Sequence, residues 1–530
     1  MNKNKKNAIV LSIVALVTLI ALVVGATYAY FKAQGGTGSS TEVKVTTYTT
    51  DMLTFTTGNA ISLYADQSSF GQEKGSLSGE TFAKATLVAN NKTNEATDNY
   101  YVYFNIENNT FKYTLGEDKP ELILTVTGPD GNEVTEISGL THITVQDREN
   151  KSISGFDVTT INGLITIANK KTITATTDAT EEQYTLKLTF VNYEGDQTEN
   201  ASSGLSAKVM IQKKMIPFHE TCNDNTLACH IAKLYTGTQG TNNIYYHDAS
   251  LTNGAGDNSY RYAGASDQVN NYVCFGSNVT PCPENNLYRI IGVFGDKVKL
   301  IKSDYATTAL LGADGDYSKM YTANNWDNSA YKGNNLANVA VYNWNKSNQN
   351  TWSLSNLNKT NLNKNFIANI GADWAAKIAD TTWKVGGNKW ANIGTQPAKT
   401  AYQNEIVNPV TTNSQDNKTE YSAKIGLMYV SDYMYAAPQD KWTLVGNNSD
   451  ASKDYRASTN VNWMYMGLVE WTISRGAGGS NGAFCVTYVG GVDNSSVGSY
   501  AFGARPVFNL TSSVNYVSGS GTAADPISIN

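Results

Sequence analysis

The sequence predicts a multidomain protein with an N-terminal signal or transmembrane helix (1–33), an antiparallel β-sandwich (41–214) and an α+β domain (217–530). Three observations predict this organisation. One apolar run follows a cluster of lysines at the N-terminus, short runs of alternating apolar and polar residues fill the next part, and all nine tryptophans lie from Trp326 to Trp471. The change in core chemistry indicates separate bodies.

The N-terminal segment has the three parts of an export signal. Lysines precede an apolar run from Ala8 to about Phe31, and small residues occupy 25–29. Such a run is also long enough to span a bilayer if it is not cleaved. We expect 1–33 to be either a signal peptide cleaved near Ala29 or a membrane anchor, with the remaining chain outside the cell.

The charge of the chain argues against nucleic acid as a partner. The formal net charge is −6 over 530 residues, and no basic cluster follows the N-terminal run. Charged residues make up only 16% of the chain, whereas Asn, Thr, Ser, Gly and Tyr are abundant. This composition is typical of an extracellular β-rich protein, and we expect no nucleic acid partner.

The five cysteines form two close pairs and one single residue: Cys222 and Cys229, Cys274 and Cys282, and Cys485. An exported chain can hold disulfides, so each pair predicts a small stapled loop. Zinc is the alternative for the first pair, because His219 and His230 flank it. One pair with adjacent histidines is a weak zinc signal, and we expect neither a metal nor a cofactor.

The β-sandwich prediction depends on period-two alternation. Apolar and polar residues alternate in four runs: 100–106, 122–126, 164–167 and 184–190. Turn residues, such as those at 128–132, separate them. We expect this domain to be a spacer; self-assembly through exposed sheet edges is the alternative.

The α+β domain contains three predicted elements. Residues 225–235 predict a short helix capped by Asn225, with Leu227, Ile231 and Leu234 on one face. Residues 287–301 predict a hairpin that turns at Gly295 and Asp296. Apolar residues at Phe366, Ile370, Trp374 and Ile378 predict a second amphipathic helix.

Two resemblances sharpen these expectations. Residues 288–293, 470–475 and the Gly-x-Arg-Pro segment in 503–510 resemble the C-type-lectin-like fold of the formylglycine-generating-enzyme type, common in gut bacterial surface proteins. That family more often has Val where this chain has Ala504. The signal ending at 25–31, before a Thr-rich strand domain, resembles exported camelysin and biofilm-matrix proteins of Gram-positive bacteria. Both resemblances imply a bacterial surface location.

The segment between Arg475 and Arg505 has an unusual composition. It contains no Lys, Glu, Gln, Met or Trp. Codons for these residues end in a purine, whereas every residue present can come from a codon ending in a pyrimidine. Randomising the adenines of AAC or AAT codons would give this set of residues, so the composition is evidence of biased origin.

Spacing within this segment separates a frame from a contact set. Apolar residues recur as a frame at Phe484, Val486, Val489, Val492 and Val497. The flanking scaffold is Trp471, Arg475, Arg505 and Pro506. The predicted ligand contacts are Cys485, Thr487, Tyr488, Gly491, Asp493, Asn494, Ser495, Ser496, Ser499, Tyr500 and Phe502.

This pattern resembles the variable region of a diversity-generating retroelement target protein. The resemblance implies that residues 476–502 form a solvent-facing patch rewritten by adenine-directed mutagenesis on a fixed C-type-lectin-like scaffold. Cys485 would then be an ordinary product of random replacement. Tyr, Ser, Gly and Asn suit adaptable recognition. The alternative is a plain Gly/Ser-rich surface loop.

The sequence argues against an enzyme. Formylglycine-generating enzymes use two cysteines, but Cys485 is alone in the C-terminal third, and no histidine follows His247. Asp314 and Asp316 are a weak calcium candidate without the downstream acidic residue of an EF-hand loop. We see no Ser-His-Asp set.

Three functions remain as expectations. The first is a surface-displayed protein whose diversified loop binds an unknown protein or glycan outside the cell. The second is an adhesin of fixed specificity, and the third is a matrix or fibre protein that assembles through its sandwich. The membrane is a further partner if the N-terminal helix is retained.

Overall fold

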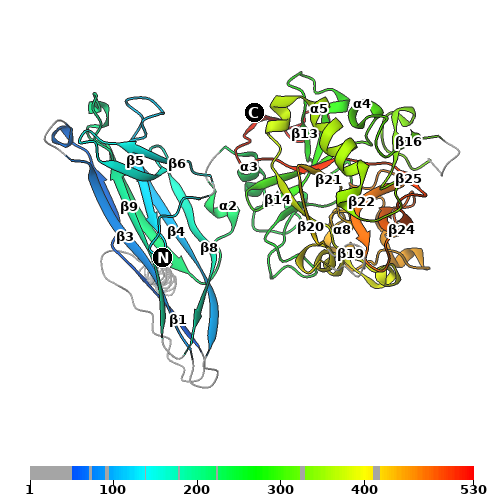
Figure 1. The fold of residues 1–530 in the computed structure, drawn as a ribbon, viewed down its shortest axis with the longest axis horizontal. Coiled ribbons are helices and arrows are strands. Elements are labelled where there is room, and N and C mark those ends of the chain that lie inside the picture. The colour runs from blue at the N-terminus through cyan, green and yellow to red at the C-terminus, as the bar shows by residue number, and fades with distance from the viewer. Residues whose placement is uncertain are drawn as a thin grey trace, which may run out of the picture. The chain divides into compact units, whose positions relative to one another are not determined.

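The computed structural model divides the chain into two compact units, Met1–Asn223 and Asp224–Asn530 (Figure 1). It describes residues 51–70, 75–89, 95–137, 139–176, 179–222, 225–322, 329–409 and 418–530. The predicted signal or anchor at 1–33 lies outside these ranges. Within them, no helix is both long and apolar enough to cross a membrane.

The first unit consists of two antiparallel sheets. The six-stranded sheet has the order β1 (Met52–Thr57), β3 (Leu77–Val88), β9 (Thr180–Phe190), β5 (Leu122–Thr127), β7 (Ser152–Asp157) and β6 (His142–Gln146). The four-stranded sheet has the order β2 (Ile61–Tyr64), β10 (Gly204–Gln212), β4 (Ala96–Asn109) and β8 (Gly163–Ala175). The short helices are η1 (Gln67–Ser69), η2 (Thr198–Asn200) and α2 (Phe218–Thr221).

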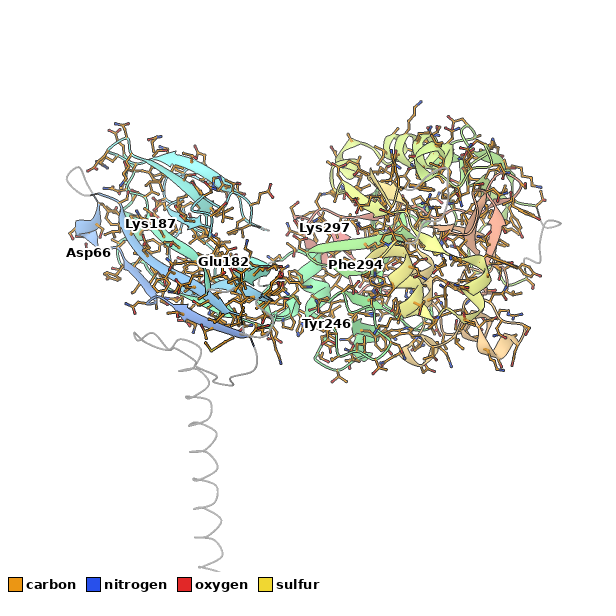
Figure 2. All side chains as sticks on the ribbon, turned by 60° about the horizontal axis from the view of Figure 1, so that its bottom comes forward. Asp66, Glu182, Lys187, Tyr246, Phe294 and Lys297 are labelled. Carbon is orange, nitrogen blue, oxygen red and sulfur yellow. A yellow bond between two sulfur atoms is a disulfide. The ribbon has the colours of Figure 1, made fainter. Side chains whose placement is uncertain are left out.

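One hydrophobic core joins the two sheets. Val102 and Phe104 of β4 pack in the same buried cluster as Leu186 and Leu188 of β9. Along β9 these residues alternate with exposed ones such as Lys187 (Figure 2). The four predicted runs lie in β4, β5, β8 and β9, so the antiparallel sandwich is confirmed.

The described residues of the second unit form five sheets. The largest has the order β11 (Ile244–Tyr246), β12 (Tyr260–Tyr262), β14 (Leu287–Phe294), β15 (Lys297–Lys302), β26 (Val507–Asn509) and β21 (Ile425–Gly426), with β13 (Tyr272–Cys274) paired to β14. A four-stranded sheet has the order β19 (Gly387–Asn388), β22 (Glu470–Gly476), β23 (Gly482–Val486) and β24 (Val492–Ser496). The small sheets are β16 (Tyr317–Met320), β17 (Ala340–Asn343) and β25 (Ala501–Phe502); β18 (Thr381–Lys384) and β20 (Glu420–Ala423); and β27 (Tyr516–Ser518) and β28 (Ser528–Ile529).

Short helices connect these strands. The α-helices are α3 (Leu227–Lys233), α4 (Thr308–Leu311), α5 (Ile367–Ile370), α6 (Ala372–Ala376), α7 (Ala398–Tyr402) and α8 (Val430–Tyr435). The 3₁₀ helices are η3 (Thr241–Asn243), η4 (Glu284–Asn286), η5 (Leu336–Asn338), η6 (Trp352–Leu354), η8 (Trp390–Thr395), η10 (Gln439–Lys441), η11 (Ala451–Lys453) and η12 (Tyr455–Ser458). Two π-helical segments, η7 (Leu357–Phe366) and η9 (Gln403–Val407), complete the set.

Of the elements predicted for this unit, the hairpin and the first helix are present, whereas the second helix is interrupted. The hairpin is confirmed: β14 and β15 pair around the turn between Phe294 and Lys297 (Figure 2). The first helix is present as α3, but its cap is Thr226, whose hydroxyl accepts from the Cys229 N–H at 3.2 Å. The prediction of Asn225 as the cap is wrong.

The second predicted helix is not continuous. Gly371, with φ of 85°, separates α5 from α6, and the preceding turns are the π-helical η7. A left-handed residue ends an α-helix, so the apolar spacing from Phe366 to Ile378 does not lie along one cylinder. Phe366 and Ile378 are nevertheless buried.

Tryptophans organise the core of the second unit. Six are almost completely buried: Trp344, Trp352, Trp383, Trp442, Trp463 and Trp471. Several indole N–H groups reach main-chain carbonyls across the unit; Trp344 donates to Thr472 at 2.9 Å and Trp463 to Tyr262 at 2.8 Å. Because each bond joins distant parts of the chain, large aromatics tie the irregular segments together.

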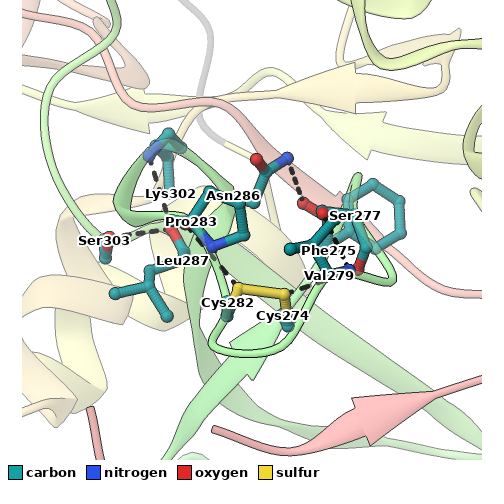
Figure 3. Close-up of a disulfide and its surroundings, with 10 residues drawn as sticks. All are labelled: Cys274, Phe275, Ser277, Val279, Cys282, Pro283, Asn286, Leu287, Lys302 and Ser303. Carbon is teal, nitrogen blue, oxygen red and sulfur yellow. Dashed lines mark hydrogen bonds between the residues drawn. A yellow bond between two sulfur atoms is a disulfide. The ribbon is translucent and has the colours of Figure 1, made fainter. Parts of the chain in front are cut away.

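The disulfide prediction is confirmed. Cys274 and Cys282 are bonded to each other and close a loop after β13 (Figure 3). Cys222 and Cys229 are disulfide-bonded as well, whereas Cys485 is a free, buried thiol. Disulfides persist in oxidising compartments, which fits an exported chain.

Candidate ligand-binding face

Residues 476–502 run through the end of the four-stranded sheet. They leave β22, form the β23–β24 hairpin and reach β25, which pairs with β17. Strand β23 lies between β22 and β24, and β24 is the last strand of its sheet. Cys485 pairs with Asp493, and Val486 pairs with Val492.

Most of the predicted frame is buried. Phe484, Val486, Val492 and Val497 are each at most 3% exposed, so their side chains belong to the core of the second unit. Val489 is 43% exposed, so its assignment to the frame is wrong. It lies at the tip of the β23–β24 turn, where the Thr487 N–H donates to the Gly491 carbonyl at 2.8 Å. A turn interrupts the strand spacing, so Val489 points away from the core.

Three predicted contacts are buried and cannot face a ligand. Cys485, Gly491 and Phe502 lie below the surface. Both faces of β23 are covered, since every residue from Gly482 to Val486 is buried, and burial raises the pKa of the Cys485 thiol to about 12. Phe502 packs on the indole of Trp471, with ring centroids 4.5 Å apart. These three assignments are corrected.

The remaining predicted contacts are partly or fully exposed: Thr487, Tyr488, Asp493, Asn494, Ser495, Ser496, Ser499 and Tyr500. Tyr500 is 46% exposed, and its ring stacks over the buried Phe502. The Ser496 hydroxyl donates to the Ser499 hydroxyl at 3.0 Å. Together with Val489, these residues define what we term the variable face.

The main chain beneath the variable face is held by asparagines from elsewhere in the chain. The buried Asn350 amide donates to the carbonyls of Gly476, Gly479 and Gly482, at 3.0, 3.0 and 2.8 Å. Asn343, on β17, donates to the carbonyls of Gly498 and Tyr500 at 3.0 and 2.8 Å. The hydrogen bonds of both asparagines go to main-chain carbonyls, so they do not depend on which side chains the segment carries.

Hydroxyl groups anchor the middle of the segment in the same way. The Tyr433 hydroxyl donates to the Gly490 carbonyl at 2.8 Å, and the Tyr465 hydroxyl donates to the carbonyl of Tyr488. The Thr472 hydroxyl donates to the Phe484 carbonyl at 2.8 Å. Buried carbonyls need partners, and here the partners come from outside the segment.

Trp390 is a surface residue that the sequence did not assign to the site. It is 61% exposed, and its indole N–H donates to the Asp493 carboxylate at 3.2 Å. Its helix, η8, lies beside β24. The concentration of tryptophans in this unit favoured a core role for all of them. Only the lysine before it and its position in an Asn- and Gly-rich stretch hinted at exposure.

The four residues predicted to flank the segment as its scaffold are buried. Trp471, Arg475, Arg505 and Pro506 all lie inside the second unit. Arg505 forms a two-point ion pair with Glu470, at 2.7 and 2.9 Å, and donates to the Met464 carbonyl at 2.7 Å. The two-point ion pair holds Arg505, and the chain that follows the variable face, against β22. The Glu470 carboxylate compensates the charge of Arg505 in the interior.

The calcium candidate has a structural role in this fold. The buried Asp316 carboxylate accepts from the main-chain N–H groups of Lys346, Asn356 and Leu357, at 3.0, 2.7 and 2.8 Å. Its lone pairs are therefore committed to ordering the start of η7. Among the described residues, no cluster of His, Cys, Asp and Glu side chains could hold a metal ion.

No family model matches the chain, and no curated protein matches it. The retroelement and C-type-lectin-like resemblances therefore stay predictions. The geometry of the variable face is the basis on which a function can be inferred.

Proposed function

We propose that this protein is displayed on a bacterial surface and binds protein or glycan ligands through the variable face, whose side chains a retroelement diversifies. The C-type-lectin-like scaffold that the sequence resembles would carry the face, and the sandwich would be its spacer. No catalytic role is assigned.

The single observation that supports this proposal is the origin of the hydrogen bonds beneath the face. Asn343, Asn350, Tyr433 and Tyr465 hold the segment by its carbonyl groups. Every amino acid carries a main-chain carbonyl, so these anchors survive replacement of the exposed side chains. A segment built in this way keeps its path while its surface chemistry changes.

The exposed chemistry suits recognition. Tyr500 and Trp390 offer large amphipathic rings with few rotatable bonds, and both rings are substantially exposed. Aromatic residues of this kind carry much of the energy in protein interfaces, while Ser and Asn supply adaptable hydrogen bonds. Asp493 adds one acceptor, already oriented by Trp390.

A library experiment tests the proposal. Positions 487, 488, 489, 493, 495, 499 and 500 are randomised in the full chain, displayed on cells and selected against several unrelated soluble proteins. We expect most members to fold and at least one specific binder to arise for some targets. A matched library randomises the buried positions 484, 486, 492 and 497, and we expect most of its members to fail to fold.

The outcomes separate the candidate functions. If the exposed library folds no better than the buried one, the proposed tolerance is wrong, and a fixed adhesin becomes the better explanation. If the sandwich alone polymerises as its concentration rises, a fibre role is favoured instead.

A further inference from the structure

A cavity of about 390 Å³ opens in the second unit, away from the variable face. Its walls include the end of β15, the start of β14 and the chain around η5, and no residue of 476–502 lines it. The Cys274–Cys282 disulfide closes the loop that precedes one wall, near Asn286 and Leu287 (Figure 3). A cavity of this size lies within the range of small-molecule sites.

Lys302, the last residue of β15, lines this cavity although only 4% of it is exposed. Its ammonium group has three donors, but its one hydrogen bond in the described structure is long, 3.4 Å to the Leu287 carbonyl. Within the described ranges no carboxylate forms an ion pair with it. The ammonium also lies over the Tyr288 ring, 5.3 Å from its centroid. A buried charge without an ion-pair partner is costly, and an anion in the cavity would supply that partner.

The nearest charged neighbours already have other partners. The Asp304 carboxylate accepts from the Tyr331 hydroxyl at 2.8 and 3.0 Å and from the Asn334 N–H at 3.2 Å. The Arg289 guanidinium donates to Asn271 at 2.6 Å and to Ser266 at 2.7 Å. No ion pair within contact distance joins Asp304 to Lys302, although the nearby carboxylate partly offsets the effect of burial, which lowers the pKa of Lys302.

The rest of the lining is rich in uncharged hydrogen-bonding groups. Six asparagines contribute: Asn285, Asn286, Asn334, Asn335, Asn338 and Asn369. The amides of Asn286 and Asn369 already donate to main-chain carbonyls, so the other four are the ones that we expect to meet a ligand. The charged lining residues are Arg289, Lys302 and Lys332 against Glu284 and Asp304, which is three cations and two carboxylates. Amides match the hydroxyl groups of a sugar, because they both donate and accept.

We propose that this cavity is a second binding site, for a small anionic sugar whose carboxylate or phosphate pairs with Lys302 and whose hydroxyl groups bond to the asparagine amides. The site is independent of the variable face. Its ligand class would stay constant while the variable face changes.

Calorimetry on the full chain tests the site with four probes: glucuronate, glucose 6-phosphate, glucose and inorganic phosphate. We expect one of the two acidic sugars to bind at least tenfold more tightly than glucose and than inorganic phosphate. The stronger of the two identifies the anion. Lys302→Met should weaken that binding at least tenfold, because it removes the charge and keeps the apolar stem.

Two further variants keep the result decisive. Lys359→Met replaces an exposed lysine that does not line the cavity, and we expect unchanged affinity. Asn338→Trp fills the cavity from an exposed rim position, and we expect lost binding with an unchanged melting temperature. The proposal is overturned if glucose or inorganic phosphate binds as tightly as the acidic sugars, or if neither acidic sugar binds. It is also overturned if binding survives both Lys302→Met and Asn338→Trp.

Discussion

The β-sandwich and the variable face both consist of antiparallel strands, but different groups hold them. In the sandwich, side chains of the strands themselves form the core, as Leu186 and Leu188 do on β9. Under the variable face, Asn350 and Tyr433 hold the main chain from outside. Both regions are constrained at buried side chains, such as Leu188 and Val492, but the carbonyl anchors beneath the variable face add support that does not depend on its exposed side chains.

The largest expected effect concerns Cys485, the one predicted contact that would be reactive if it were exposed. Burial raises its pKa from 9.0 to about 12, so the folded thiol holds roughly a thousandfold less thiolate at pH 8. We expect iodoacetamide to alkylate the native chain at least roughly a thousandfold more slowly than the urea-unfolded chain, as measured by mass spectrometry. If the alkylation rates of the native and unfolded chains differ by less than a factor of about ten, Cys485 is exposed and its assignment to the core is wrong.

The second-largest expected effect is a loss of stability when a buried side chain of the sandwich is shortened. Leu188→Ala removes a fully buried side chain from β9 and should lower the free energy of unfolding of the first unit by about 2–5 kcal/mol. Lys187→Ala, one position earlier and exposed, should change it by less than about 0.5 kcal/mol. Urea unfolding followed by circular dichroism measures both. Equal effects would mean that side-chain burial does not hold this strand.

The third-largest expected effect concerns the hydrogen bonds that Asn350 donates to the main chain beneath the variable face. Asn350→Ala leaves the carbonyls of Gly476, Gly479 and Gly482 without their donor, and we expect a loss of about 2–3 kcal/mol in the second unit. Asn460→Ala, at an exposed asparagine of the same unit, is the control and should be neutral. If Asn350→Ala is also neutral, main-chain anchoring does not explain the tolerance proposed for the segment.

The smallest expected effect distinguishes the exposed Val489 from the buried Val492. Val489→Ser alters a valine that is 43% exposed and should change the unfolding free energy by less than about 0.5 kcal/mol. Val492→Ser alters a fully buried valine three residues later and should cost about 2–3 kcal/mol. Thermal unfolding of the two variants compares them directly, and a reversed order would contradict the assignment of both residues.

Local patterns explain what the sequence could predict. The alternation along β9 and the turn residues of the β14–β15 hairpin depend on near neighbours, and both elements are present. The break at Gly371 was missed because the apolar spacing continues through a residue with positive φ. A Gly within an amphipathic pattern is the only local sign of such a break.

The site was predicted in part, because burial there depends on what packs on the two faces of each strand. Cys485 is buried together with its neighbours Phe484 and Val486, so both faces of β23 are covered and alternation could not separate inward from outward residues. Trp390 meets Asp493 across roughly a hundred residues of chain, and Asn350 reaches Gly482 over a similar separation. These contacts are long-range, so composition could identify the segment but could not separate its exposed from its buried side chains.

The most direct test of the central claim is deep sequencing of this gene, with its flanking DNA, from a population of the source organism. We expect substitutions confined to adenine positions in codons of 476–502, concentrated at exposed residues such as Tyr488 and Tyr500 and absent at Asn343, Asn350 and Tyr433. We also expect a near-copy repeat and a reverse transcriptase nearby. A uniform segment without such a repeat would contradict diversification and leave a binding face of fixed specificity.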